Sequence, residues 1–327
     1  MKHLLLLLLL PLFASAQVKI SAVGREITAP DGFSLLSYEL FESKHKKPFA
    51  HPSGVFFYVQ GSEPATVTDK IGLLASAVIM RGRVILVEKR GCGPEKIDTA
   101  TFYRYDDKQT RVQDHLAVLD AYLKDVPPDV PVVVVGGSEG GDIAAMLAEK
   151  RPRITHLILI GSGGGISQKE EFELLVRQQP GYLGADNVQA LDSVLNAIRT
   201  STDSLAMWAG HPYKRWNSYL YDATVDHLKM VAAPILLLHG DADMNVPVTS
   251  ARSLAEAFKK TGKNNLTYIE YPDVDHTLTN VRDGKSRYPL MEVDIVNWMT
   301  AQGLIPEKYA RKLTKRVKKA HADIFQR

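Results

Sequence analysis

The stretch VVVVGGSEGGDIAAMLAE, residues 132–149, constrains the fold of this chain more than any other feature. Four consecutive valines are typical of a strand that is buried on both faces. Glycines then surround one serine, Ser138, and the small residues that follow have helical spacing. Gly136 and Gly140 stand two positions on either side of Ser138, where side chains would collide in a tight turn. We therefore expect the hydroxyl of Ser138 to be held clear of the backbone at the end of a buried strand.

Similar apolar runs recur along the chain, and most of them end in glycines or acidic residues. The runs are 54–62, 83–93, 132–137, 154–165, 234–243 and 266–272. Segments with helical spacing separate them, and a hairpin turning at Asp31-Gly32 comes first. Apolar strands without alternation, separated by helices, predict an α/β fold with a mostly parallel, doubly wound sheet covered on both faces. Ligands bind such sheets at the carboxyl ends of the strands.

This pattern breaks between residues 166 and 231, which are mostly polar, helical in spacing and richer in tryptophan and tyrosine. We predict that residues 166–231, called the insertion below, form a helical lid between two core segments, 17–165 and 232–304. Five aromatic residues indicate either an apolar, partly lidded pocket or packing within the lid itself. They are Trp208, Tyr213, Trp216, Tyr219 and Tyr221.

The two ends of the chain differ from the core. Residues 1–16 predict a signal peptide, because a basic start and a short apolar run precede the small-x-small pattern Ala14-Ser15-Ala16. That run is shorter than the roughly 20 apolar residues of a membrane span. We therefore expect export, periplasmic or secreted, after cleavage near Ala16. Residues 305–327 carry eight Lys or Arg and predict a basic C-terminal helix, either solvated or in weak contact with an acidic membrane surface.

The composition is that of an ordinary globular protein, with 327 residues, 45% hydrophobic and 24% charged. A net charge of +3 does not indicate a nucleic-acid partner, and nothing in the sequence indicates an oligomeric state. Cys92 is the only cysteine, so no internal disulfide can form. We interpret it as a small buried hydrophobic residue rather than a reactive thiol.

A serine hydroxyl is a weak nucleophile near neutral pH and needs a base that an acid orients. In enzymes with such a serine turn, the acid follows the serine in the chain and the histidine comes last. HGDADMNVP, residues 239–247, offers Asp243 and Asp241 just beyond a strand. We prefer Asp243, which lies far enough beyond the strand to turn back, and expect Asp241 to cap the turn. DVDHTL, residues 273–278, supplies His276 beyond the next strand.

Attack by the serine creates an oxyanion, which needs fixed N–H donors. The predicted donors are the backbone N–H of Glu139 and that of Ser62, with Glu63 as the next candidate, and Gly61 would let this loop approach closely. The Glu139 side chain either faces solvent or caps the helix, or else it deters anionic substrates or holds a substrate amine.

In this order, the motifs GGSEGG, HGDADMNVP and DVDHTL resemble those of the α/β-hydrolase fold family, over most of residues 26–303. VEKRGCGPE, residues 87–95, is similar to a stretch of the prolyl aminopeptidase branch and related lid-bearing esterases. The resemblance implies a Ser138–His276–Asp243 triad, no metal and no organic cofactor. Gln60 replaces the family's histidine before the oxyanion glycine, and Glu88 replaces an aspartate. The branch binds a free amino terminus with lid acids. The pair Glu170-Glu171 is our candidate for that role, but no motif fixes it, so peptidase activity stays open.

Three functions remain open at this point. The first is an exported serine hydrolase that cleaves an ester or amide of a small to medium molecule. The second is an aminopeptidase or dipeptidase that uses the same triad on a short peptide. The third is a non-catalytic binding protein on a hydrolase scaffold, which has little use for three triad residues in the correct order.

Overall fold

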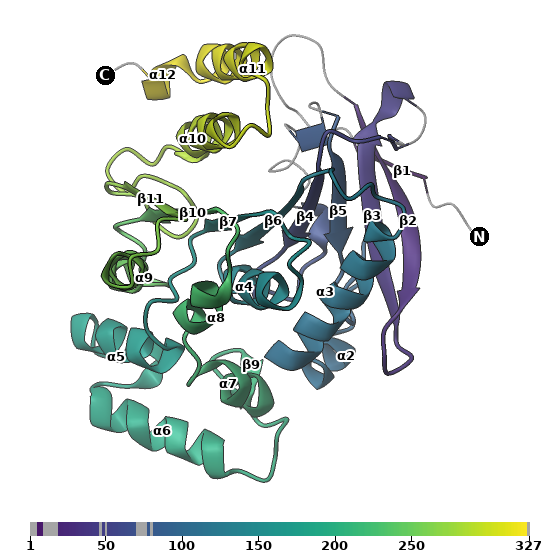
Figure 1. Cartoon of the computed structure of the whole chain (residues 1–327). Coiled ribbons are helices and arrows are strands. Elements are labelled where there is room, and N and C mark those ends of the chain that lie inside the picture. The colour runs from purple at the N-terminus through teal and green to yellow at the C-terminus, as the bar shows by residue number, and fades with distance from the viewer. Residues whose placement is uncertain are drawn as a thin grey trace.

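The computed structural model describes residues 5–8, 19–45, 48–49, 51–69, 77–78 and 81–325. Its centre is a nine-stranded sheet with the order β1-β2-β3-β5-β4-β6-β7-β10-β11 (Figure 1). The strands are β1 Leu5–Leu8, β2 Ile20–Thr28, β3 Ser34–Glu42, β4 Val55–Val59, β5 Arg83–Val87, β6 Val132–Gly137, β7 His156–Ile160, β10 Ile235–Gly240 and β11 Leu266–Tyr271. The strands from β5 to β11 in this order are parallel, and β1, β2 and β3 are antiparallel. This arrangement confirms the predicted α/β fold class.

Helices connect these strands. They are α2 Thr99–Arg104, α3 Lys108–Leu123, α4 Gly140–Lys150, α5 Gln168–Gln178, α6 Val188–Thr200, α7 Tyr213–Tyr219, α8 Thr224–Met230, α9 Val248–Lys260, α10 Tyr288–Ala301, α11 Glu307–Ala320 and α12 Ala322–Phe325. Short 3-10 turns cover Ser43–His45 and Tyr182–Gly184, and a small hairpin joins β8 Met207–Trp208 to β9 His211–Pro212.

The valine run of β6 shows why the strands lack alternation. Val132 and Val134 belong to the apolar cluster under α3, α4, α8 and α9. Val133 and Val135 belong to a second cluster, under α10 and α11. Successive side chains of a strand point to opposite faces, so a strand covered on both faces needs apolar residues at every position. Figure 1 shows the helices on the two sides of the sheet.

The insertion divides into two parts by its packing. Helices α5, α6 and α7 share an apolar cluster of their own, which includes Phe172, Leu195 and Trp216. They lie together at one end of the molecule in Figure 1. Helix α8 instead contributes Val225 and Leu228 to the main core beside α4. The packing therefore favours a shorter insertion that ends before α8, within the predicted range 166–231.

The ends of the chain extend the sheet and its covering layer. β1 lies inside the predicted signal peptide and forms the edge of the sheet, where it pairs with β2. Residues 1–4 and 9–16 lie outside the described residues, so the signal peptide stays a prediction. At the other end, α11 packs on α10 through Ala310, Leu313 and Val317, and most of its basic side chains are exposed. No helix in the described part of the chain is long and apolar enough to cross a bilayer.

Candidate active site

Ser138 occupies a strained turn between β6 and α4. Its φ angle is 53°, in the left-handed region that residues other than glycine rarely adopt. Backbone and side-chain hydrogen bonds from the neighbouring β7 region hold this turn in place. The Ser138 N–H donates to the Ile160 carbonyl at 2.9 Å, and the Ser162 hydroxyl donates to the Ser138 carbonyl at 2.8 Å. The strain is therefore supported by the adjacent strand, as is usual where backbone strain serves a site.

The glycines on either side of Ser138 are required by close backbone approach. A Cβ added to Gly136 would lie 2.5 Å from the Gly140 carbonyl oxygen, across the turn. A Cβ added to Gly140 would overlap the carbonyl oxygen of Val59, at the end of β4. Side chains at these two positions would therefore push α4 away from the sheet.

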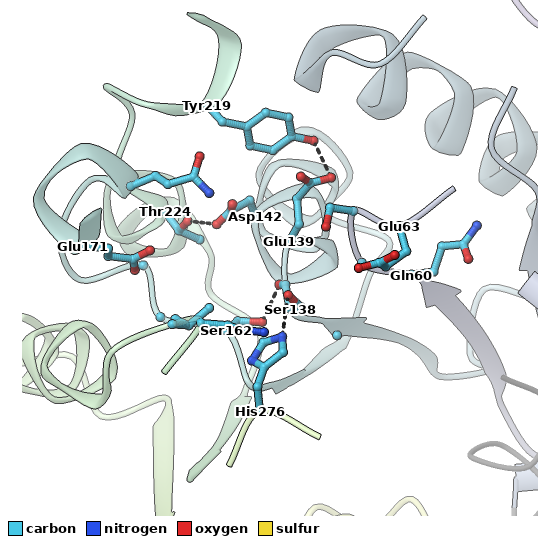
Figure 2. Close-up of a pocket in the computed structure, with 18 of the residues that line it drawn as sticks. Gln60, Glu63, Ser138, Glu139, Asp142, Ser162, Glu171, Tyr219, Thr224 and His276 are labelled. Atoms are coloured by element: carbon cyan, nitrogen blue, oxygen red, sulfur yellow. Dashed lines mark hydrogen bonds between the residues drawn. The ribbon is translucent and has the colours of Figure 1, made fainter. Parts of the chain in front are cut away.

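Ser138, His276 and Asp243 lie in one hydrogen-bonded line. His276 Nε2 is 3.0 Å from Ser138 Oγ (Figure 2). On the other side of the ring, His276 Nδ1 is 2.7 Å from Asp243 Oδ2. An ionised carboxylate only accepts hydrogen bonds, so Nδ1 carries the proton and Nε2 is left to accept from the serine hydroxyl. The other oxygen of Asp243 accepts from the backbone N–H groups of Asn245 at 2.8 Å and Val246 at 2.9 Å. These two donors fix the carboxylate that faces His276.

The competing acid, Asp241, points elsewhere. Its Oδ1 accepts from the Asp273 backbone N–H at 2.5 Å and joins the loops that follow β10 and β11. His239 is buried on β10, and its Nε2 lies 3.0 Å from the Val246 carbonyl and 3.6 Å from Asp243 Oδ2. It packs below the carboxylate and has no contact with the pocket.

The loop after β4 approaches the serine closely. A Cβ added to Gly61 would lie only 3.4 Å from Ser138 Cβ. Ser62 follows in this loop and, like Glu139, lines the pocket beside Ser138. Within the described residues, the backbone N–H groups of Ser62 and Glu139 donate no hydrogen bond to another residue. The assignment of these two N–H groups as oxyanion donors stays a prediction.

The Glu139 side chain is not exposed, and it makes no capping hydrogen bond to α4. The solvent-facing or capping interpretation is therefore wrong. Only 4% of the side chain is exposed, and it lies between Arg111 of α3 and Arg215 of α7, each bonded to one carboxylate oxygen. The Tyr219 hydroxyl donates to it as well, at 3.1 Å (Figure 2). Burial opposes ionisation, but Arg215 and Arg111 outweigh it and hold the pKa of Glu139 below its usual value.

A cavity of about 770 Å³ opens above Ser138. Its walls come from the loop after β4, the serine turn, the loop after β7 and the insertion. Of the aromatic residues predicted to form a pocket or to pack, Trp216 and Tyr219 line this cavity. Trp208 and Tyr213 pack inside the insertion, and Tyr221 is 50% exposed. Phe172 and Tyr182 also line the cavity, and the sequence analysis did not identify them.

Several acidic residues line the same cavity. Glu171 of α5 is buried there, and burial raises its pKa to about 8, so it holds a proton at neutral pH. Its neighbour Glu170 instead forms a capping box with Ser167 at the start of α5, so the predicted pair is divided between two roles. The carboxyl group of Glu63 is exposed at the edge of the cavity, beside the predicted oxyanion loop.

Three buried basic side chains near the serine were not identified from the sequence: Lys89, Arg111 and Arg215. Burial lowers the pKa of Lys89 to about 7. Lys89 and Arg90 come two and three residues after the end of the apolar strand β5, and basic residues at a strand end are a signal that could have been used. For Arg111 and Arg215 the local pattern offers no comparable signal. Cys92 is half-buried, and burial raises the pKa of its thiol to about 11, which does not favour a reactive thiolate. No cluster of three or more metal-binding side chains occurs among the described residues.

Comparison with known proteins identifies the family of this chain. The family model described as serine aminopeptidase, S33, matches residues 82–283, more than half of the chain. The chain belongs to the serine aminopeptidase S33 family. This membership confirms the α/β-hydrolase resemblance of the three motifs.

Individual relatives of this S33 chain are distant. The probable carboxylic ester hydrolase LipM of Mycobacterium tuberculosis is 22% identical over 207 residues, which cover 61% of this chain and 46% of LipM. The chain therefore spans about half the length of the curated relative it matches. Among solved structures, Est1E from Butyrivibrio proteoclasticus with bound ferulic acid has a TM-score of 0.60 at 18% identity, covering 85% of this chain and 98% of Est1E. The acylaminoacyl peptidase of Pyrococcus horikoshii has a TM-score of 0.55 at 16% identity, covering 83% of this chain and 40% of the peptidase.

Proposed function

We propose that this protein is an exported serine hydrolase that cleaves an ester or amide of a small to medium molecule through an acyl-enzyme. The observation that carries the proposal is the line from Ser138 Oγ through the His276 ring to Asp243, with gaps of 3.0 and 2.7 Å. S33 family membership and the cavity above Ser138 support it. The insertion acts as the lid of this cavity.

In the first step, His276 Nε2 takes the proton of the Ser138 hydroxyl as its oxygen attacks the substrate carbonyl carbon. Asp243 stabilises the imidazolium that forms and holds its Nδ1–H in place. The carbonyl oxygen becomes an oxyanion, which the N–H groups of Glu139 and Ser62 stabilise. His276 then gives its proton to the leaving alcohol or amine, and the bond to that group breaks.

In the second step, a water molecule repeats the sequence on the acyl-enzyme. His276 takes a proton from the water as its oxygen attacks the acyl carbon. When the tetrahedral intermediate collapses, the bond to Ser138 Oγ breaks and the serine regains its proton from His276. The acid product leaves, and the triad returns to its starting state.

The test compares Ser138→Ala with Ser193→Ala, using a p-nitrophenyl ester and a fluorophosphonate probe. Ser193 is an exposed residue of α6 whose hydroxyl bonds only its own helix, so its variant serves as the matched control. We expect Ser138→Ala to lose turnover and labelling, and Ser193→Ala to keep both. If the wild type is neither labelled nor active, the third function, a binding protein on a hydrolase scaffold, replaces this one.

An aminopeptidase is the second candidate, and the acidic residues of the cavity favour it. The carboxyl group of Glu63 at the cavity edge has the charge to bind a substrate ammonium group, whereas protonated Glu171 would act as a hydrogen-bond donor. Comparing aminoacyl-arylamides with simple acyl esters separates the two candidates. Preference for a free amino terminus that Glu63→Gln abolishes would establish the peptidase, and equal turnover of N-acetylated substrates would exclude it.

Export and membrane contact are further parts of the proposal. The pattern of residues 1–16 supports export to the periplasm or medium, and N-terminal sequencing of the secreted protein should begin near Gln17. The exposed basic residues of α11 support weak contact with anionic lipid. Vesicles containing phosphatidylserine should retain the protein at low salt and release it at high salt. Equal retention by neutral vesicles would contradict an electrostatic contact.

A further inference from the structure

The residue after the nucleophile links two parts of the molecule. One oxygen of the Glu139 carboxylate is bonded to Arg111, which belongs to the core helix α3, and the other to Arg215, which belongs to helix α7 of the insertion. All three side chains are at most 5% exposed. We call Arg111, Glu139 and Arg215 the charge cluster. Because Glu139 also supplies one predicted oxyanion N–H, the cluster acts directly on a residue of the proposed catalytic machinery.

The same cluster reaches the second predicted donor. Arg111 Nη2 donates to the Gln60 carbonyl at 2.7 Å, two residues before Ser62. One guanidinium group therefore bonds both segments that carry the predicted oxyanion donors. Lys89 adds a second fixed point, since its Nζ donates to the Gly61 carbonyl at 2.9 Å and also to the Glu63 carbonyl. The loop between β4 and Glu63 is thus fixed by hydrogen bonds from two buried basic side chains rather than by secondary structure.

Arg215 is also packed against aromatic rings of its own helix, α7. Its guanidinium group lies over the Trp216 ring at 4.2 Å and the Tyr219 ring at 4.9 Å. Its Nε is 3.9 Å from Asp106 Oδ2, an ion-pair contact, and His211 Nδ1 donates to the same oxygen at 2.8 Å. Movement of α7 would therefore carry Arg215 away from Glu139 and leave buried charges without partners, which is strongly unfavourable.

We infer that the charge cluster is a positioning unit that sets the spacing of the two oxyanion N–H donors. It also makes that spacing depend on the position of helix α7, and so on how the insertion packs against the core. Arg111 fixes the two donor segments relative to each other, and Arg215 transmits the position of α7 to Glu139. The inference rests on the proposed function, because it concerns how that reaction is supported. Arg111 and Arg215 are positioning residues here, since they act through Glu139 and the loop after β4.

The experiment measures kcat and KM of Arg111→Met and Arg215→Met with p-nitrophenyl acetate, which is small enough to need little of the insertion. We expect kcat to fall about 10- to 100-fold while KM changes by less than about 3-fold, because the loss is in the transition state. The Ki of a trifluoromethyl ketone, which forms a tetrahedral adduct with the serine, should rise in parallel with the loss of kcat. A role in packing alone would instead raise KM for long-chain esters and leave the Ki unchanged.

Lys108→Met is the matched control. Lys108 also lies on α3, is 3% exposed and bonds Asp222 of the insertion at 3.1 Å, but it does not contact Glu139. We expect this variant to lose stability and to keep kcat for the acetate ester. Equal losses of kcat in the control and in the two arginine variants would overturn the inference.

If a methionine variant does not fold, the more conservative variant Arg111→Lys is measured in its place. A lysine retains the charge but cannot bond Glu139 and Gln60 through a planar fork. We expect a lower kcat and a higher Ki in this folded variant, and wild-type values would overturn the inference. Loss of activity in Ser138→Ala with unchanged kcat in all arginine variants would reject the inference alone. An inactive wild type would reject the proposed function as well.

Discussion

Replacement of Asp243 by asparagine tests the orientation of the proposed base. The two backbone N–H groups of Asn245 and Val246 require an acceptor at the position of Oδ1. They would therefore fix the amide with its oxygen towards them and its NH2 group towards His276. An NH2 group donates to Nδ1, so the imidazole would carry its proton on Nε2 and could no longer accept from the Ser138 hydroxyl.

The expected loss is about 10⁴-fold in kcat, or about 5 kcal/mol in the activation free energy, the size seen for this replacement in serine protease triads. Steady-state kinetics with a p-nitrophenyl ester measure it, and circular dichroism checks that the fold is kept. Asp241→Asn is the control, because its amide oxygen can still accept from the Asp273 N–H, and it should keep activity within about 3-fold. A folded Asp243→Asn variant within tenfold of the wild type would refute the tautomer argument.

Two further predictions concern stability. The Cβ of Gly140→Ala would overlap the Val59 carbonyl and should lower the free energy of unfolding by about 1–3 kcal/mol. Gly24→Ala is the control and should change this free energy little, because the nearest atom to its Cβ would lie 3.7 Å away. Equal denaturation midpoints for the two variants would contradict the prediction. In the folded state Glu171 has a pKa of about 8, against an ordinary value of 4.5. Between pH 4.5 and pH 8 the folded state therefore binds more protons than the unfolded state. The free energy of unfolding then falls as pH rises, by up to about 1.4 kcal/mol per pH unit. Denaturation at pH 5 and pH 8 should show a smaller fall for Glu171→Gln, and parallel falls would exclude a protonated Glu171.

The sheet and the serine turn were predictable because their signals are local. An unbroken apolar run predicts each buried strand, because a strand covered on both faces needs apolar residues at successive positions. β6 is an example, since its alternate valines belong to the apolar clusters on the two faces of the sheet. The turn at Ser138 needs glycines at fixed offsets, since close backbone approach excludes side chains there. The order of Ser138, Asp243 and His276 could be predicted for a related reason. The strands β6, β10 and β11 are parallel, so their carboxyl ends meet on one side of the sheet.

The surroundings of Glu139 could not be predicted in the same way. Arg111 is 28 residues away along the chain and Arg215 is 76 residues away, so their meeting depends on how α3 and α7 dock. A glutamate at the start of a helix is ordinarily a solvated, favourable charge, and that local preference led to the wrong interpretation. The packing of α8 against the main core could not be predicted from the sequence for a similar reason. The spacing of Val225 and Leu228 shows an apolar face but does not show which element will cover it.

A carboxylate beside a nucleophile would ordinarily oppose the negative charge that develops during attack. Here Glu139 faces Arg111 and Arg215, so two guanidinium charges outweigh this carboxylate. Burial lowers the pKa of the nearby Lys89 to about 7, so this lysine is not needed for the balance. Removing Glu139 alone would leave Arg111 and Arg215 without their shared partner, and breaking a buried pair costs about 3–5 kcal/mol. Glu139→Gln should therefore lose stability and catalytic rate together. The carboxylate is thus better understood as the counter-ion that lets two buried cations remain beside the oxyanion site than as a group that contacts substrate.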